Sequence, residues 1–370
     1  NIKESKNKGW TCRTPDMPWE CPHNLLNKNR TFFRDKRTAK YLRKNNITIG
    51  VILLFTPLFP LSLYFFISAA CIKWNERNIL DYVEWRGDID FVSSEFNEID
   101  SLILSQLSYI GFDGIISNNN KELLTLKEAS AKFFSVHDEK YILGVLLPKE
   151  IVTLLKVAGD SVRFGNLKLS CYINHVDKDR QEQFSAVTFE LNDGIFIAFR
   201  GTDDTLIGWK EDFNMCFISP VPAQEESVKY LDYVLSLYKW RSGKVRIGGH
   251  SKGGNLAVYS AAFCPKKFRK KIAAVYNNDG PGFDDAMMKN PLYQEMLSKI
   301  TTFLPQSSTV GMLLEHEEPY IVIQSTASGL IQHDVFSWQL KGKHFVTTSL
   351  SENCRFLDKT LKNWLAGMDN

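Results

Sequence analysis

A serine between two glycines is the strongest chemical signal in this chain of 370 residues. Residues 249–253 read Gly-His-Ser-Lys-Gly, after a short apolar run and before a helix-like run at 255–263. In a strand–turn–helix unit, glycines two residues before and after a serine avoid Cβ clashes, so the hydroxyl projects clear of a strained turn. The spacing predicts Ser251 as a nucleophile between Gly249 and Gly253. The alternative is a glycine-rich turn that carries a bystander serine.

A serine that attacks a carbonyl carbon needs hydrogen-bond donors for the oxyanion that forms, and each donor is typically worth about 3 kcal/mol. Residues 194–202 read as a buried strand that ends in Arg-Gly-Thr. We expect these donors to be the backbone N–H groups of Thr202 and of Lys252, the residue after the serine. Without Ser251 downstream, the same segment would be read as an ordinary strand end with an exposed arginine.

The carboxylate of the predicted site is assigned to Asp279. The apolar run at 272–276 breaks at Asn-Asn-Asp-Gly-Pro-Gly, and in open α/β sheets the functional groups gather at the carboxyl ends of the strands. The alternative is a turn residue that bonds its own backbone. Two acidic positions compete with it: Asp334, and the acidic stretch at 315–318.

The general base is assigned to His333, because it is the only histidine that follows the last apolar strand-like run at 320–324 before the chain leaves the sheet. Three other histidines compete less well. The tight turn at Ser251, called a nucleophile elbow, points adjacent side chains in different directions. We therefore expect His250 to pack or to hydrogen-bond locally. We expect His316 to lie on a solvated face or lid, and His344 to lie on the surface. In a triad, the histidine takes the serine proton and the aspartate fixes the imidazole tautomer.

The elements needed to position these residues can be read from the sequence. Apolar residues at helical spacing predict helices, and short β-branched or aromatic runs predict strands. Asn192-Asp-Gly194 predicts a hairpin between two of the strands. The repeated order of strand, helix and strand predicts a mostly parallel α/β-hydrolase-like sheet with helices on both faces, and residues 123–162 are expected to supply a helical cap. The predicted helices are 99–110, 150–158 and 226–240, and the predicted strands are 184–191, 195–199, 272–276, 300–304 and 320–324.

Three of these segments together resemble the fungal-type triacylglycerol lipases, which carry a Phe-Arg-Gly-Ser/Thr oxyanion segment, a Trp-x-x-Asp pair and Gly-His-Ser-Leu-Gly. The matching segments here are Phe199-Arg-Gly-Thr202, Trp209-Lys-Glu-Asp212 and Gly249-His-Ser-Lys-Gly253. The resemblance implies an α/β-hydrolase fold and hydrolysis of esters.

A second family, the Mbeg-like α/β-hydrolases of mostly bacterial origin, is more similar. The resemblance covers about residues 76–370, and its members usually begin near Asn78 as soluble proteins. The segments that carry it are Asn78-Ile-Leu-Asp-Tyr-Val-Glu-Trp85, Asn97-Glu-Ile-Asp100, Leu104-Ser-Gln-Leu-Ser-Tyr109, Asn278-Asp-Gly-Pro-Gly-Phe283, Val310-Gly-Met312 and Gln332-His333.

Two departures from the lipase pattern bear on the site. The lipases carry their acid after the following strand, but residues 304–310 here read Leu-Pro-Gln-Ser-Ser-Thr-Val and offer no carboxylate, which moves the acid to Asp279. In addition, Lys252 stands where the lipases have leucine. Its cation either raises the local potential for an anionic substrate or bridges to a surface carboxylate, and we favour the bridge.

The first 75 residues differ in character from the rest. Basic residues cluster at 34–44, and the uncharged stretch that follows at 47–72 is about 26 residues long, enough to span a bilayer as a transmembrane helix. Pro57 and Pro60 would kink it. The positive-inside rule places residues 1–46 in the cytoplasm and the hydrolase domain outside. If residues 1–75 are not native to the protein, we expect a cytoplasmic enzyme. The amphipathic end of the chain suggests a truncated C-terminus.

Composition excludes several classes of partner and site. A net charge of +3 is too small to predict nucleic-acid binding. The cysteines show no Cys-x-x-Cys spacing, so no metal site is predicted; only Cys12 and Cys21 are spaced for a disulfide, and free thiols are an equal alternative. No glycine-rich phosphate loop precedes a helix, and no cofactor is predicted.

Two functions from different classes remain. The first is a serine hydrolase that cleaves carboxylic esters, lipid-like ones above all, through Ser251, Asp279 and His333; thioesterase, amidase and peptidase activities share this chemistry. The second is a non-catalytic or regulatory protein that uses an α/β-hydrolase fold to bind a ligand, because a fold does not determine a function.

Overall fold

The structure is a computed structural model that describes residues 77–352 and 354, except 146, 204, 216 and 239–242. The basic segment 1–46, the expected transmembrane stretch 47–72, the Cys12–Cys21 pair and the C-terminal segment 355–370 lie outside the described residues. Among the described helices, none combines the length and the apolar character needed to cross a bilayer.

An eight-stranded sheet forms the centre of the described region, with its strands in the order of the sequence. The first four strands pair antiparallel, and the strands from β4 to β8 pair parallel. The predicted mostly parallel sheet is therefore confirmed for the half that carries the predicted site. The strands are β1 (Leu124–Thr125), β2 (Lys168–Asp177), β3 (Glu182–Leu191), β4 (Gly194–Phe199), β5 (Lys244–His250), β6 (Ile272–Asn278), β7 (Ile300–Pro305) and β8 (Tyr320–Ile323).

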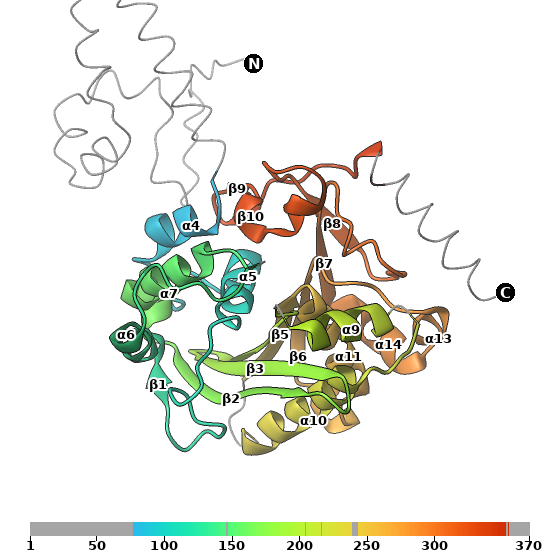
Figure 1. The fold of residues 1–370 in the computed structure, drawn as a ribbon, viewed down its shortest axis with the longest axis horizontal. Helices are drawn as coiled ribbons and strands as arrows, with labels where there is room; N and C mark the ends of the chain where they lie inside the picture. The colour runs from blue at the N-terminus through green and yellow to red at the C-terminus, as the bar shows by residue number, and fades with distance from the viewer. Residues whose placement is uncertain are drawn as a thin grey trace, which may run out of the picture. The chain divides into compact units, whose positions relative to one another are not determined.

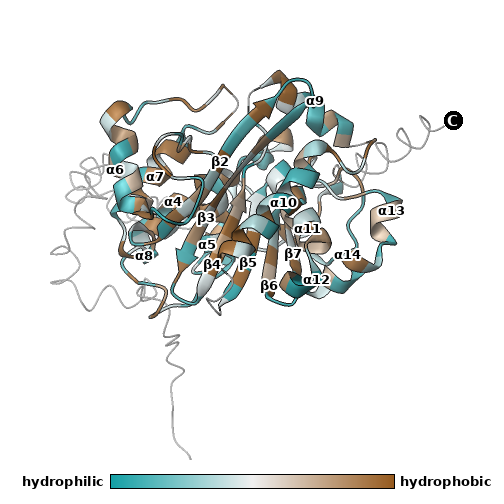
Figure 2. Cartoon of the chain, turned by 90° about the horizontal axis from the view of Figure 1, so that it is seen from below, coloured by the Kyte–Doolittle hydropathy of each residue, from teal (hydrophilic) through white to brown (hydrophobic). Residues whose placement is uncertain are grey.

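Helices cover both faces of this sheet (Figure 1). The alternation of side chains along β4 shows why: Phe196 packs into the apolar core on one face, while Ile197 and Phe199 pack into the core on the other. The first face carries α4 (Ile79–Arg86), α5 (Glu98–Leu107), α6 (Leu126–Val136), α7 (Glu150–Asp160) and α8 (Val162–Gly165); the second carries α10 (Pro222–Leu237), α11 (Lys252–Phe263), α12 (Lys266–Arg269), α13 (Asp285–Met288) and α14 (Pro291–Met296). Figure 2 shows hydrophobic residues concentrated along the central strands.

Local sequence signals account for several boundaries. The turn Asn192–Asp193 joins β3 to β4 as predicted, with Leu191 opposite Gly194. Pro222 stands in the first turn of α10, where a proline costs no hydrogen bond, so this helix begins before the predicted residue 226. The expected cap at 123–162 forms β1, α6 and α7, and these two helices pack against each other within the layer on the first face.

A buried ion pair holds α5 in place. The Arg163 guanidinium on α8 donates to both carboxylate oxygens of Asp100, at 2.8 and 2.5 Å, and neither side chain is exposed. Asp100 also caps the start of α5 by accepting from the N–H of Asn97 at 2.9 Å. The end of α5 points Tyr109 toward the carboxyl edge of the parallel strands, where it contacts His250.

Short elements follow the parallel strands. The helix α9 (Leu206–Met215) connects β4 to α10, and the 3-10 helices η4 (Gly329–His333) and η5 (Val335–Ser337) come after β8. The remaining pieces are the 3-10 helix η3 (Leu297–Lys299) and a two-stranded ribbon of β9 (Leu340–Lys341) and β10 (His344–Phe345).

Candidate active site

Ser251 occupies a sharp turn between β5 and α11. Its backbone has φ 58° and ψ −136°, a conformation that residues with a Cβ seldom adopt, and its carbonyl accepts from the N–H of Gly254 at 2.8 Å. The turn is tight enough that a Cβ on Gly249 would lie 2.2 Å from the carbonyl carbon of Gly253. Both glycines are therefore needed for the backbone to turn here, and the turn carries Ser251 at the carboxyl end of β5.

A carboxylate–imidazole pair lies at the same edge of the sheet. Asp279 directly follows β6, and its Oδ2 lies 2.7 Å from Nδ1 of His333 at the end of η4. The other carboxylate oxygen accepts from the Ser308 hydroxyl at 2.5 Å. The Asp279 side chain is fully buried, whereas His333 is 28% exposed at its side chain. The hydrogen bond to Asp279 thus holds the Nδ1 edge of the imidazole, while part of the ring remains exposed to solvent.

The competing carboxylates are engaged elsewhere. Asp334 accepts from the N–H of Phe336 at 3.0 Å and so caps η5. Glu318 accepts from the Thr302 hydroxyl at 2.5 Å, from Tyr293 and from His316. Although burial would raise the pKa of Glu318, the hydrogen bond and charge of His316 and the two hydroxyl groups lower it to about 2. No hydrogen bond joins either carboxylate to His333, whereas Asp279 bonds it directly.

The expectation for His316 was wrong. Its side chain is 5% exposed, although Glu315 and Glu317 on either side of it are exposed. Its imidazole bonds Glu318 at 3.0 Å and the carbonyl of Gly311 at 2.6 Å. His344 is 63% exposed at its side chain, as expected for a surface residue.

His250 bonds residues that are far away in sequence, whereas we expected local packing or bonding. Its Nε2 lies 2.9 Å from the carbonyl oxygen of His333, and its Nδ1 lies 3.1 Å from the hydroxyl of Tyr109. Burial, and secondarily the charge of His333, hold the pKa of His250 well below 6.5. The elbow does turn this side chain away from a direct bond with Ser251, but it turns it toward the other histidine.

Lys252 does not bridge to a surface carboxylate, so the favoured expectation for it was wrong. Its side chain is 1% exposed, and its Nζ lies 2.9 Å from Oε2 of Glu211, a side chain with no exposure. The oxygens of Gln183 accept two further hydrogen bonds from it, at 3.0 and 2.8 Å. The long side chain reaches back under α9 because Glu211 points into the protein there, where the N–H groups of Gln183 and Ala223 also donate to it.

The expected oxyanion segment lies beside the serine. A Cβ built on Gly201 would lie 3.1 Å from Cβ of Ser251, so the loop after β4 passes close to the elbow. The Thr202 hydroxyl donates to Oδ2 of Asp212 on α9 at 2.5 Å. Burial raises the pKa of Asp212, against the lowering effect of the nearby Lys252 charge. As the first residue of α11, Lys252 has a backbone N–H without an acceptor inside the helix.

Several residues of this cluster could not be predicted. Ser308, Glu211, Gln183 and Tyr109 contact the predicted residues from distant parts of the chain. The only sequence signal was indirect: a lysine beside the elbow serine needs a partner if it is buried, and Trp-Lys-Glu-Asp offers one.

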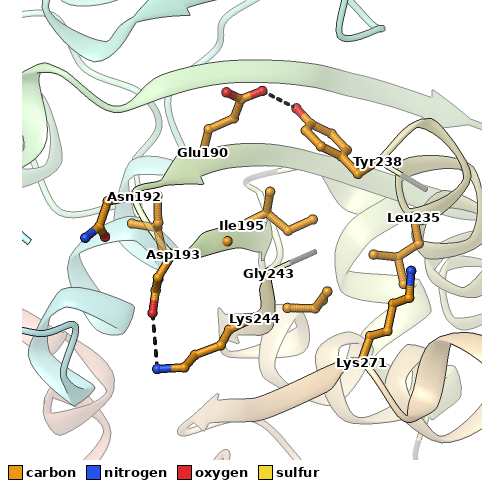
Figure 3. A pocket seen from close by; sticks show the side chains of 12 residues that line it. Glu190, Asn192, Asp193, Ile195, Leu235, Tyr238, Gly243, Lys244 and Lys271 are labelled. Carbon is orange, nitrogen blue, oxygen red and sulfur yellow. Dashed lines mark hydrogen bonds and ion pairs between the residues drawn. The ribbon is translucent and has the colours of Figure 1, made fainter. Parts of the chain in front are cut away.

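A cavity of about 290 Å³ lies at the opposite edge of the sheet (Figure 3). It is lined by the β3–β4 turn and by the first residues of β4 and β5, among them Asp193 and Lys244, which form an ion pair at 3.3 Å. It is therefore separate from the Ser251 cluster. Among the described residues, no group of three or more His, Cys, Asp or Glu side chains is arranged to hold a metal ion.

Several solved lipase structures show a low similarity to this chain. The Rhizomucor miehei lipase in its propeptide complex is 17% identical, with a TM-score of 0.35 over 52% of this chain and 65% of the lipase. The M37 lipase is 14% identical, with a TM-score of 0.37 over 59% of this chain and 70% of that lipase. The Yarrowia lipolytica Lip2 lipase is 11% identical, with a TM-score of 0.35 over 66% and 94%. The chain thus spans about 65% of the length of the Rhizomucor lipase. At these values the likeness says nothing about the reaction.

No curated protein sequence matches the chain. The model of the Mbeg1-like family matches residues 158–370, which is more than half of the chain and includes Ser251, Asp279 and His333. The protein therefore belongs to the Mbeg1-like family.

Proposed function

We propose that this protein is a serine hydrolase that cleaves carboxylic esters through Ser251, Asp279 and His333. The observation that carries the proposal is the 2.7 Å bond between His333 Nδ1 and the buried Asp279 carboxylate, at the same sheet edge as the strained Ser251 turn. A buried aspartate that bonds the imidazole in this way fixes the tautomer in which Nε2 is free to accept a proton. A glycine-rich turn with a bystander serine would not require this pair.

In the proposed reaction, the Ser251 hydroxyl attacks the ester carbonyl carbon while Nε2 of His333 takes its proton. The N–H groups of Thr202 and Lys252 stabilise the oxyanion of the tetrahedral intermediate. The intermediate collapses, the C–O bond to the alcohol breaks, and His333 returns the proton to the departing alcohol. Water, activated by His333, then hydrolyses the acyl-enzyme by the same steps. Asp279 stays ionised throughout and stabilises the imidazolium.

We propose a lipid-like acyl substrate. The support is α9, which carries Asp212 beside the oxyanion segment and exposes three large apolar side chains. Leu206, Trp209 and Phe213 are 74%, 52% and 60% exposed, and their spacing of three and four residues places them on one face of the helix. An apolar face next to a hydrolytic site fits a substrate with an acyl chain better than a small polar ester.

Membrane association through residues 47–72 remains part of the proposal, on the strength of the uncharged stretch alone. A chain that starts at Asn78 should then hydrolyse a water-soluble ester as well as the full chain does. It should lose efficiency mainly on bilayer-embedded substrate, because the anchor supplies local concentration and no catalytic group. Full-length protein found wholly in the soluble fraction after cell fractionation contradicts the anchor.

The decisive experiment uses a fluorophosphonate probe and a short-chain nitrophenyl ester. We expect the full chain to react with the probe at one serine and to hydrolyse the ester. Ser251→Ala should not be labelled, and its turnover should fall by several orders of magnitude. Its circular dichroism spectrum should be unchanged. Ser260→Ala is the matched control, because Ser260 is a buried serine further along α11 whose hydroxyl donates to the carbonyl of Ala257. A folded wild-type protein that neither labels nor turns over favours the alternative of a ligand-binding protein.

A further inference from the structure

The second histidine of the site lies against the first. The rings of His250 and His333 have centroids 4.5 Å apart and are inclined by 31°, and His250 Nε2 lies 2.9 Å from the His333 carbonyl oxygen. A carbonyl oxygen only accepts, so Nε2 of His250 carries the hydrogen. In the neutral ring, Nδ1 is then an acceptor.

The partner of that acceptor comes from the helical region before the segment matched by the family. The Tyr109 hydroxyl, just beyond α5, lies 3.1 Å from Nδ1 of His250, so it donates to this nitrogen. The close approach depends on a glycine: a Cβ on Gly201 would lie 2.1 Å from the Tyr109 hydroxyl oxygen. Tyr109 is 5% exposed, and the hydroxyl therefore has little water to compete with the imidazole.

The charge state of His250 matters because His333 becomes positive in the proposed reaction. Burial favours the neutral form of His250, and its pKa lies well below 6.5. Two imidazolium rings at this separation would repel each other. A neutral His250 instead places an uncharged ring against His333. Its Nε2–H still donates to the carbonyl oxygen of His333. The titratable groups that interact with this pair are Asp279, Asp212, Asp334 and Tyr109.

We propose that Tyr109 and His250 are positioning residues for His333: the Tyr109 hydroxyl fixes the Nε2–H tautomer of His250, and His250 holds the main chain and the ring of His333 in the orientation that faces Ser251. The helical region at 77–157 is then part of the active site, and not only a cover for the sheet. This inference rests on the proposed hydrolase function, in which His333 is the base.

The first test removes one hydroxyl group. Tyr109→Phe in the full chain should lower kcat on a nitrophenyl ester about tenfold with little change in KM, the size expected for one hydrogen bond. Tyr172→Phe is the matched control, because Tyr172 is another tyrosine that is 5% exposed and its hydroxyl donates to Asp113 at 3.1 Å. If both variants keep the same kcat, Tyr109 does not position His333 and the inference fails.

The second test uses rescue at His250. Glutamine can donate its amide N–H to the His333 carbonyl, whereas leucine fills the space without a donor. We expect His250→Gln to keep at least ten times the kcat of His250→Leu at equal thermal stability. Equal kcat values in the two variants would mean that the hydrogen bond to His333 has no role in turnover, which overturns the inference.

A third measurement does not depend on activity. Nitrogen-15 NMR of the histidine rings should show His250 as the Nε2–H tautomer at neutral pH, and Tyr109→Phe should shift the His333 resonances. A protonated His250, a Nδ1–H tautomer, or His333 resonances unchanged by Tyr109→Phe contradicts the arrangement. If the wild-type protein fails to label or to turn over, the hydrolase proposal has failed, and the NMR result alone decides whether this contact network exists.

Discussion

The two ends of strand β5 each carry an ion pair, and the pairs differ in how far water reaches them. At the start of the strand, Arg246 bonds Asp193 at 2.9 and 2.7 Å, with side chains that are 8% and 36% exposed. Just past its end, Lys252 bonds Glu211 at 2.9 Å, with side chains that are 1% and 0% exposed. Asp193 of the first pair lines a cavity, whereas Lys252 of the second pair directly follows Ser251. Of the two pairs, the one at the end where we place the chemistry is thus the more fully removed from water.

The largest effect is expected for the acid at the second edge. Asp279→Asn should lower turnover roughly ten-thousand-fold, because the amide favours the wrong tautomer of His333. Asp334→Asn is the matched control, since Asp334 adjoins His333 in sequence but only caps η5, and it should change turnover less than about tenfold. Steady-state assays on a nitrophenyl ester with the two purified variants check this. The reverse ranking would assign the acid to Asp334.

The buried pair should govern stability. Lys252→Met leaves the buried Glu211 carboxylate without its cation and should lower the free energy of unfolding by about 3 kcal/mol. The double variant Lys252→Met/Glu211→Leu should lose less than Lys252→Met alone, because it leaves no unpaired charge. Urea unfolding of the three proteins gives these values. A double variant that is less stable than Lys252→Met would show that the ion pair or the hydrogen bonds from Gln183 and Ala223 to Glu211, and not the unpaired charge, carry the stability.

His250 should make the stability depend on pH. Its pKa is lower in the folded protein than the usual value of 6.5, because it is buried and close to His333. Between these two pKa values the unfolded chain binds more protons, so the free energy of unfolding falls as the pH decreases below 6.5, by about 1.4 kcal/mol per pH unit for one group. Above pH 6.5 the group contributes no slope. Urea titrations at a series of pH values should show a smaller slope in His250→Gln. An identical slope would assign the dependence to other groups.

The smallest effect is expected at the cavity edge. The Arg246 hydrogen bonds lower the pKa of Asp193, but the carboxylate is partly solvated, which weakens the pair. Asp193→Asn should therefore cost less than about 1 kcal/mol and should leave ester hydrolysis unchanged. Thermal melts and the same ester assay measure both. A marked loss of activity in a fully folded Asp193→Asn protein would mean that the two edges are coupled.

The sequence predicted those parts of the molecule that depend on local pattern. The Asn-Asp-Gly turn, the glycine spacing around Ser251 and the ends of the parallel strands each follow from a few adjacent residues, and the structure has a hairpin, a strained turn and polar strand ends at these places. Whether Ser251, Asp279 and His333 act as a triad stays a prediction.

Contacts between distant segments could not be predicted in this way. The sequence gives no indication that Tyr109 meets His250, because the two are 141 residues apart and a tyrosine after a helix fits many environments. Lys252 was misjudged because lysine is usually exposed, and its burial depends on Glu211 pointing inward from α9. His316 was misjudged because acidic neighbours suggest a solvated segment, whereas Glu318 is itself buried.

The pairing of Lys252 with Glu211 also constrains how the sequence can drift. A leucine at position 252, as in the resembled lipases, would remove the cation that pairs with Glu211. The Glu211 carboxylate would keep its hydrogen bonds from the N–H groups of Gln183 and Ala223. A neutral residue at position 211 would strand the ammonium instead. Each single replacement leaves one buried charge unpaired and so lowers the free energy of unfolding. Positions 211 and 252 should therefore change together among relatives of this chain. A basic residue after the elbow serine should predict an acidic residue just before the aspartate of the Trp-x-x-Asp pair.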